Sequence, residues 1–348
     1  WPRLPGMRWS GGGVGGGRRG HVVGVGSVGT KGGVGIAGFT LGTGLTIPAG
    51  SYDLATSDWG AHGLVDRALS TGEINRLLRW AQQHHTAAKY ATLKTRMDLI
   101  CMNAVDVTVY DTSRDSDGGA WVAAATTQSW YNEALNTATR GATRGFPKLA
   151  VIVAEATRVK IYDGDDPALP MWMVFETGGS GSNWSFLVTG AAKTACAMLN
   201  GQLLVSSGSD ALVSINFVSD TANQRYSGGL FYWDVGISER NAEPPRLGGS
   251  NGPEAIISSN VHDVAIAVLP DAPIDGVTGL PVPTIAVATT GGGSIIRHDG
   301  DVSNYATNVY TEVHFESSGD VWFRRSSTNA FYVASDYSGA TFVAALTY

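Results

Sequence analysis

The chain has 348 residues, a formal net charge of −6 and 46 glycines, a glycine share well above the usual value of about 7%. Nucleic-acid binding needs a basic surface that displaces counterions, so the acidic balance predicts no nucleic-acid partner. The sequence contains no apolar run of the roughly 18 residues that a spanning helix requires, so we expect no membrane insertion.

The N-terminus lacks the apolar segment and the small-residue cleavage site of a signal peptide. The chain begins at Trp1 and not at methionine, which we expect of a processed product or a piece of a longer polypeptide. Cys101 and Cys196 lie in apolar contexts without disulfide spacing, so we expect two buried free thiols.

Residues 1–69 are predicted to form a glycine-rich arm or a partial jelly-roll module. In the first 50 residues, valine and isoleucine alternate with glycine or small residues, which indicates thin β-structure or an extended arm lying on a partner. Glycine loses more conformational freedom on folding than any other residue. We therefore expect neighbours to order this arm.

Residues 70–91 are predicted to form a helical connector. Ser70 is placed as an N-cap with Glu73 three residues on, which is a capping-box pattern. Ile74 and Leu77 begin an apolar series at helical spacing. The sequence thus predicts one short helix between the arm and the rest of the chain.

Residues 92–348 are predicted to be mainly β-structure. Short apolar runs alternate with clusters of glycine, aspartate, asparagine and serine, for example LAVIVAEATRVKIYD, ACAMLNGQLLVSS and DVWFRR. Such a series of short strands separated by turns is typical of sandwiches, barrels and propellers.

An internal repeat favours a propeller. VTVYDTSRDSDGGAWV aligns with VKIYDGDDPALPMWMVF, so that Tyr110 matches Tyr162 and Trp121 matches Trp172. A period of about 40 to 50 residues with several strands is typical of propeller blades. We predict a propeller-like repeat domain with about five blades, forming a complete or a partial ring.

The stretch DTSRDSDGG at 111–119 has three interpretations. Oxygens of Asp111, Ser113, Asp115 and Asp117 at alternating positions fit a loop-borne calcium site, the one cofactor that the sequence suggests. Aspartate and glycine also suit a hairpin turn, and the similar stretch YDGDDP favours a repeated structural turn. Acid/base catalysis would need two carboxyls in distinct environments, which clustered aspartates on a turn do not provide.

Two further segments suggest binding. In SGSNWSF, Asn183 and Trp184 lie in a glycine/serine loop, where an exposed indole beside an amide would form a platform for a sugar ring. The proline-rich loop 271–284, DAPIDGVTGLPVPT, is long for a hairpin and suggests a contact with a partner or another subunit.

Several long phrases resemble tail-fibre-like or tail-associated structural proteins of tailed bacteriophages. They are YDTSRDSDGGAW, SWYNEALNTATRG, FPKLAVIVAEATRVKIYDGDDPALPMWMVF and VHDVAIAVLPDAPIDGVTGLPVPTIAVATTGG. The segment LVDRALSTGEINRLLRWAQ resembles the closing stretch of a laminin-G/concanavalin-like jelly-roll module. The first resemblance implies propeller-like β repeats and a place in the virion tail, and it carries no catalytic residues onto this chain.

The sequence therefore predicts a non-enzymatic virion protein of a tail fibre or tail tip, with attachment to a host-surface glycan. We expect other tail proteins, further copies of the chain and a bacterial surface glycan as partners. One alternative is a virion-associated glycan-degrading enzyme on a propeller fold. The other is a calcium-dependent, lectin-like module that uses Asp111, Asp115 and Asp117.

Overall fold

A computed structural model of the protein describes residues 25–28, 33–36, 39–40, 46–47, 50–53, 87–188, 192–209, 211–250, 252–306, 308–316, 319–327, 331–334 and 344–346. The chain divides into two compact units, residues 1–66 and 67–348. The capping-box helix expected from Ser70 lies outside the described residues up to residue 86. Most of the glycine-rich arm also lies outside them.

The described residues of the first unit form short antiparallel strands. The strands are β1 (Val25–Val28), β2 (Gly33–Ile36), β3 (Phe39–Thr40), β4 (Thr46–Ile47) and β5 (Gly50–Asp53). β2 pairs with both β1 and β5, and β3 pairs with β4. The thin β-structure predicted for this segment is therefore present in these strands.

The described part of the second unit contains helix α2 (Ala87–Cys101) and four sheets, which we name blades 1 to 4. Blade 1 consists of β6 (Ala104–Asp111), β7 (Leu149–Glu155), β8 (Arg158–Asp163), β9 (Met171–Ser180), β10 (Asn183–Trp184) and β11 (Leu187–Val188). Blade 2 consists of β12 (Lys193–Leu199), β13 (Gln202–Ser207), β14 (Ala211–Asn216), β15 (Thr221–Tyr226), β16 (Gly229–Trp233) and β17 (Arg246–Ser250).

Blades 3 and 4 are shorter, with four strands each in the described residues. Blade 3 consists of β18 (Val261–Ala267), β19 (Thr284–Thr289), β20 (Gly292–Ile296) and β21 (Val302–Ala306). Blade 4 consists of β22 (Tyr310–Phe315), β23 (Val321–Arg325), β24 (Phe331–Ala334) and β25 (Ala344–Leu346). Neighbouring strands in each blade pair antiparallel in chain order, except that β11 pairs parallel with β9.

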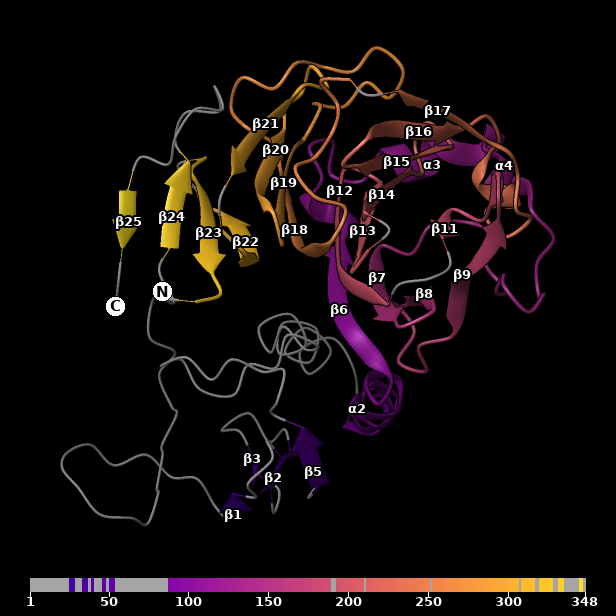
Figure 1. Cartoon of the computed structure of the whole chain (residues 1–348). Helices are drawn as coiled ribbons and strands as arrows, with labels where there is room; N and C mark the ends of the chain where they lie inside the picture. Colours follow the sequence, from indigo (N-terminus) through magenta and orange to yellow (C-terminus); the bar gives the residue numbers. More distant parts are fainter. Residues whose placement is uncertain are drawn as a thin grey trace. The chain divides into compact units, whose positions relative to one another are not determined.

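The blades pack against one another through their first strands. β6 lies against β12, β12 against β18, and β18 against β22, and Figure 1 shows β6, β12 and β18 side by side. Antiparallel meanders whose first strands meet in sequence are the arrangement of propeller blades. The fold is thus mainly β and propeller-like, as the sequence predicts.

The blade boundaries differ from those expected from the repeat. Tyr110 and Tyr162 lie in β6 and β8 of the same sheet, on either side of β7, so the repeated phrases do not mark successive blades. The described residues contain four blades where about five were expected. The β pattern expected from residue 92 is also wrong for the first stretch, because α2 continues to Cys101.

The connection between β6 and β7, residues 112–148, is a long excursion that fills the space between blades 1 and 2. It contains the helical turns η1 (Thr112–Arg114), α3 (Trp121–Ala124), η2 (Ala125–Thr127) and α4 (Ser129–Asn132). A further turn, η3 (Ile237–Glu239), follows β16. The expectation that DTSRDSDGG is a hairpin turn is therefore wrong, because this stretch opens the excursion.

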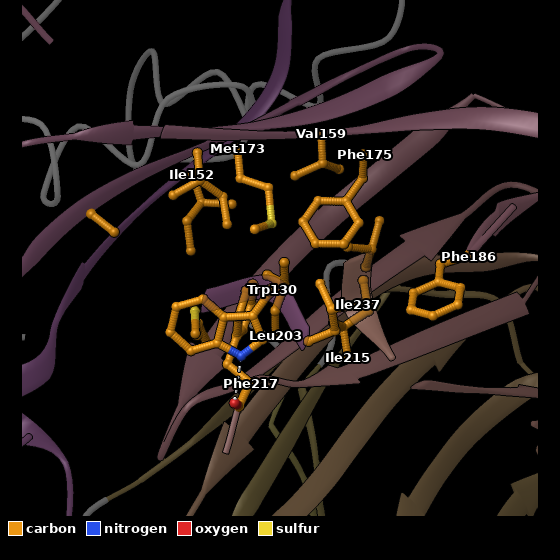
Figure 2. Close-up of a cluster of buried hydrophobic side chains, with 14 of the residues drawn as sticks. Trp130, Ile152, Val159, Met173, Phe175, Phe186, Leu203, Ile215, Phe217 and Ile237 are labelled. Atoms are coloured by element: carbon orange, nitrogen blue, oxygen red, sulfur yellow. Dashed lines mark hydrogen bonds between the residues drawn. The ribbon is translucent and has the colours of Figure 1, made fainter. Parts of the chain in front are cut away.

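The largest hydrophobic core lies between blades 1 and 2. Side chains of β7 and β9 face those of β13 and β14, and Trp130 of α4 lies between the two groups (Figure 2). The Trp130 ring packs edge-on against Trp172 and Phe217 at centroid distances of 5.7 Å, and its Nε1 donates to the Phe217 carbonyl at 2.9 Å. Full burial of a large apolar side chain contributes about 1.5–3 kcal/mol.

A buried charged cluster ties the excursion to blade 1 and to the connection between β16 and β17 of blade 2. Arg140 and Arg240 are 0% and 1% exposed, and both approach the carboxylate of Glu133. Arg240 Nη1 lies 2.9 Å from Glu133 Oε2, and Arg140 Nε lies 3.7 Å from the same atom. Burial lowers the pKa of Arg140 to about 10, and Glu133 opposes this shift.

Candidate functional site

Asp111 and Asp117, near the two ends of the 111–119 stretch, accept hydrogen bonds from nearby backbone N–H groups. Asp111 Oδ1 accepts hydrogen bonds from the Ser113 N–H at 3.1 Å and the Ser113 hydroxyl at 2.6 Å. Asp117 accepts from the backbone N–H groups of Gly119 and Trp121 at 2.9 and 2.8 Å, and so holds the start of α3. Gly119 has a φ of 84°, which favours glycine.

Asp115 has a different role, because it joins blade 1 to blade 2. One of its oxygens accepts from the Tyr110 hydroxyl and from Trp121 Nε1, the latter at 2.7 Å. The other accepts from the Asn200 N–H at 2.8 Å, and the Gly201 N–H donates to the Tyr110 hydroxyl at 3.0 Å. We name Tyr110, Asp115, Trp121, Asn200 and Gly201 the inter-blade clasp.

The clasp depends on the turn between β12 and β13. Asn200 and Gly201 have φ values of 50° and 69°, the left-handed pair that an Asn-Gly hairpin turn adopts. This conformation presents their N–H groups to blade 1. The Asn200 side-chain amide also donates to the carbonyl of Pro281 at 3.2 Å, which links the clasp to the loop before β19.

Burial changes the acidity of the clasp. Asp115 is 6% exposed, and the resulting desolvation raises its pKa above the ordinary value, against the opposing effect of its hydrogen bonds. The pKa of the Tyr110 hydroxyl is also raised, first by burial and then by the Asp115 charge. Both groups therefore favour their protonated forms more than they would in water.

The structure gives no support for calcium at this stretch. Among the described residues, no three His, Cys, Asp or Glu side chains form a group that could hold a metal ion. Both carboxylate oxygens of Asp115 and of Asp117 already accept hydrogen bonds from the protein. The hydroxyl of Ser113 points to Asp111, with which it forms its own hydrogen bond.

The candidate sugar platform is less open than expected. Trp184 is half-buried in the β9–β10 hairpin and packs against the main core, whereas Asn183 is exposed. The indole Nε1 of Trp184 donates to the Gly181 carbonyl at 2.7 Å, and the Arg246 guanidinium lies 5.2 Å from the ring centroid. The expectation of a free-standing indole is wrong, because Gly181 of the β9–β10 turn and Arg246 of β17 are its neighbours.

A polar cleft lies between blades 2 and 3, with a volume of about 130 Å³. Blade 2 lines it with Gln202, Ser214, Asn223 and Arg225, and blade 3 provides the turn after β20. Arg297, His298 and Gly300 of that turn line the opposite wall. The cleft therefore combines two guanidinium groups, an imidazole, two amides and a hydroxyl.

Apolar side chains complete the cleft. They are Leu212, Val282, Pro283, Ile285 and Ile296. Within the described residues around the cleft, no acidic side chain is among those that line it. Small-molecule sites likewise combine apolar side chains with a few polar groups, although they are usually more apolar than this cleft.

The proline-rich loop 271–284 is ordered by its own aspartate. Asp275 Oδ1 accepts from the N–H groups of Val277 and Thr278 at 2.9 and 2.7 Å, and the Thr278 N–H is the main cause of a lowered Asp275 pKa. Ile274 and Val277 are 63% and 82% exposed. The loop thus presents two apolar side chains to solvent, where a partner contact was expected.

The two cysteines and His314 are not among the residues that line the cleft. Cys196 is buried as predicted, whereas Cys101 is half-buried, and neither forms a disulfide. The ring of His314 stacks on Trp322 with an interplanar angle of 6°.

The sequence analysis did not identify Arg225 and Gln202 of the cleft, because the strands that contain them carry no recognisable motif.

Comparisons with known proteins give only distant likenesses. No family model and no curated protein matches the chain. Among solved structures it is similar to a protein of unknown function from Bacteroides caccae, at 11% identity and a TM-score of 0.29 over 57% of each chain. It is also similar to an extracellular domain of a two component system from B. thetaiotaomicron, at 12% identity and a TM-score of 0.28 over 56% of this chain and 28% of that one.

A third likeness is to YCF48 bound to D1 peptide, at 6% identity and a TM-score of 0.28 over 57% of this chain and 63% of that one. The chain spans less than two thirds of the length of each of these three structures. Likenesses this low carry no argument about function. The propeller-like fold follows from the strand order and the contacts between blades.

In the part of the chain that the structure describes, none of the helices has the length and apolarity needed to cross a membrane.

Proposed function

We propose that the chain is a non-enzymatic structural protein of a tailed-bacteriophage virion, in a tail fibre or at the tail tip, and that its blades attach the particle to a glycan on the bacterial surface. The cleft between blades 2 and 3 is the observation that supports attachment most directly. Its guanidinium, amide and hydroxyl groups suit the hydroxyls of a saccharide, and its apolar side chains suit the ring faces.

The use of the carboxylates supports binding over catalysis. Glycoside hydrolysis needs two carboxyl groups that flank one bond. Asp115 and Asp117 are occupied in holding blades and backbone together, and no acidic side chain of the described residues lines the cleft. These features suit a rigid scaffold that presents a binding surface.

The remaining partners follow from the resemblance to tail proteins and from exposed apolar groups. Other tail proteins and further copies of the chain are the partners that we propose. The exposed side chains of Ile274 and Val277 offer a contact to such a neighbour. The short strands of the first unit would gain stability from assembly, since sheets of two or three short strands are marginal on their own in water.

Binding and turnover can be separated in one experiment. The purified full chain is tested against immobilised lipopolysaccharide O-chains, capsular polysaccharides and teichoic acids, and new reducing ends are measured in parallel. We expect retention on at least one polysaccharide, without new reducing ends and without release by EDTA. New reducing ends would support the enzyme, release by EDTA would support the calcium-dependent module, and no retention on any polysaccharide would contradict attachment.

A further inference from the structure

The charge of Arg225 sets the cleft apart from the other polar surfaces of the second unit. Arg225 lies on β15 opposite Leu212 of β14, and its side chain is half-buried. Its guanidinium Nη1 donates to the backbone carbonyl of Glu254 at 3.1 Å. On the other side, Nη2 lies 3.8 Å from the position that a Cβ on Gly300 would take.

Arg225 has no carboxylate within ion-pair distance among the described residues, whereas its neighbour Arg297 has two. Arg297 Nη2 lies 3.2 Å from Asp301 Oδ2, and its Nε lies 3.5 Å from Asp299 Oδ1. Two carboxylates therefore more than offset the charge of Arg297 within its own turn. Burial lowers the pKa of Arg225, and the charge of Glu254 opposes that shift from beyond contact distance. A half-buried guanidinium without a counterion is stabilised by any anion that reaches it.

We propose that the cleft binds the acidic group of a saccharide, a carboxylate or a phosphate, and that the Arg225 guanidinium holds this group. The planar guanidinium presents paired N–H donors that match both oxyanions, and such charge-assisted pairs are about twice as strong as neutral hydrogen bonds. This inference rests on the proposed glycan attachment and names the class of glycan.

The size and lining of the cleft agree with this assignment. Whole drug-sized ligands occupy pockets of about 300–1,000 Å³, so about 130 Å³ accommodates one substituted part of a larger glycan. Asn223 and His298 line the same cleft and offer further donors or acceptors for ring hydroxyls. Gln202 Nε2 donates to Ser214 Oγ at 2.7 Å, which leaves its carbonyl oxygen as an acceptor.

Matched ligands test the acidic group. Trigalacturonic acid is compared with its neutral methyl ester, and mannose 6-phosphate with mannose, by ligand-observed NMR on the full chain. We expect the wild type to bind at least one acidic probe about tenfold or more tightly than its neutral counterpart. The two pairs separate a carboxylate ligand from a phosphate ligand.

Matched variants test the residue. Arg225→Gln should abolish the preference for the acidic probe. Arg225→Lys should weaken this preference by about threefold or more, because lysine lacks the paired N–H donors of the planar guanidinium. Arg158→Gln is the control, since Arg158 is paired with Glu176 on blade 1, away from the cleft, and it should change nothing. If Arg225→Gln fails to fold, Arg225→Lys decides the question.

The outcomes separate this inference from the proposed function. Equal binding of acidic and neutral probes by the wild type would overturn the acidic-group inference and leave glycan attachment standing. An unchanged preference in Arg225→Gln and Arg225→Lys would place the anion elsewhere and would also overturn it. Absence of binding to every probe and to every polysaccharide of the panel would contradict both.

Discussion

The buried cluster of Glu133, Arg140 and Arg240 gives the sharpest stability prediction. Glu133→Gln removes the carboxylate that faces both guanidiniums and keeps the shape of the side chain. Both arginines are within 1% of complete burial, so neither charge regains full hydration after the substitution. We expect this variant to lose far more stability than a surface substitution.

The magnitude follows from the geometry. Removing one partner of a buried ion pair typically lowers the free energy of unfolding by about 3–5 kcal/mol, because the other charge stays buried without compensation. Glu133 serves Arg240 at 2.9 Å and Arg140 at 3.7 Å, so one substitution leaves two uncompensated cations. Backbone carbonyls of Trp172 and Val174 still accept from these arginines, which keeps the expected loss within that range.

Urea unfolding followed by tryptophan fluorescence measures this loss, since Trp130 and Trp172 lie in the adjacent core. Glu176→Gln is the matched control. Glu176 pairs with Arg158 at 3.3 Å with both side chains 39% exposed, so its loss should be below about 1 kcal/mol. Equal midpoints for the two variants would refute the view that Glu133 neutralises a buried charge.

Five further outcomes are expected. Asp115→Ala should lower the free energy of unfolding by about 3 kcal/mol, because three buried donors lose their acceptor. Asp117→Ala should lower it by about 1 kcal/mol, because the N–H groups of Gly119 and Trp121 lose their acceptor. Urea midpoints check both values. Because the pKa of Asp115 is raised, the stability linked to its protonation should be fully present below the ordinary aspartate pKa and lost as pH rises through the raised value. The difference in free energy of unfolding between wild type and Asp115→Asn, measured across that pH range, checks this. The lowered pKa of Asp275 predicts the opposite, a contribution lost as pH falls through that value, which Asp275→Asn tests. Calcium should leave the melting temperature unchanged, and a rise at millimolar calcium would revive the metal site.

The strands could be predicted from sequence because their pattern is local. Short, mainly apolar runs bounded by turn clusters define β7, β13 and β19 without reference to distant segments. The assignment of blades failed because Tyr110 in β6 and Tyr162 in β8 precede similar turns at the same end of a single sheet. Similar phrases reflected similar turn chemistry, with Asp111 and Asp163 each accepting from the residue two positions on.

The candidate site depends on contacts that the sequence could not reveal. Asp115 meets Asn200 across 85 positions, so nothing in the aspartate cluster distinguishes it from Asp117. The Asn200–Gly201 dipeptide does predict a hairpin turn, which is the one local signal of the clasp. Arg225 and Arg297 approach one cleft only because blades 2 and 3 pack together.

Cryo-electron microscopy of a tailed-phage particle that contains this chain tests the central claim most directly. We predict density for the four described blades at the tail fibre or tail tip, with the cleft between blades 2 and 3 facing outward. Density inside the capsid or in the wall of the tail tube would contradict attachment as the role of the chain.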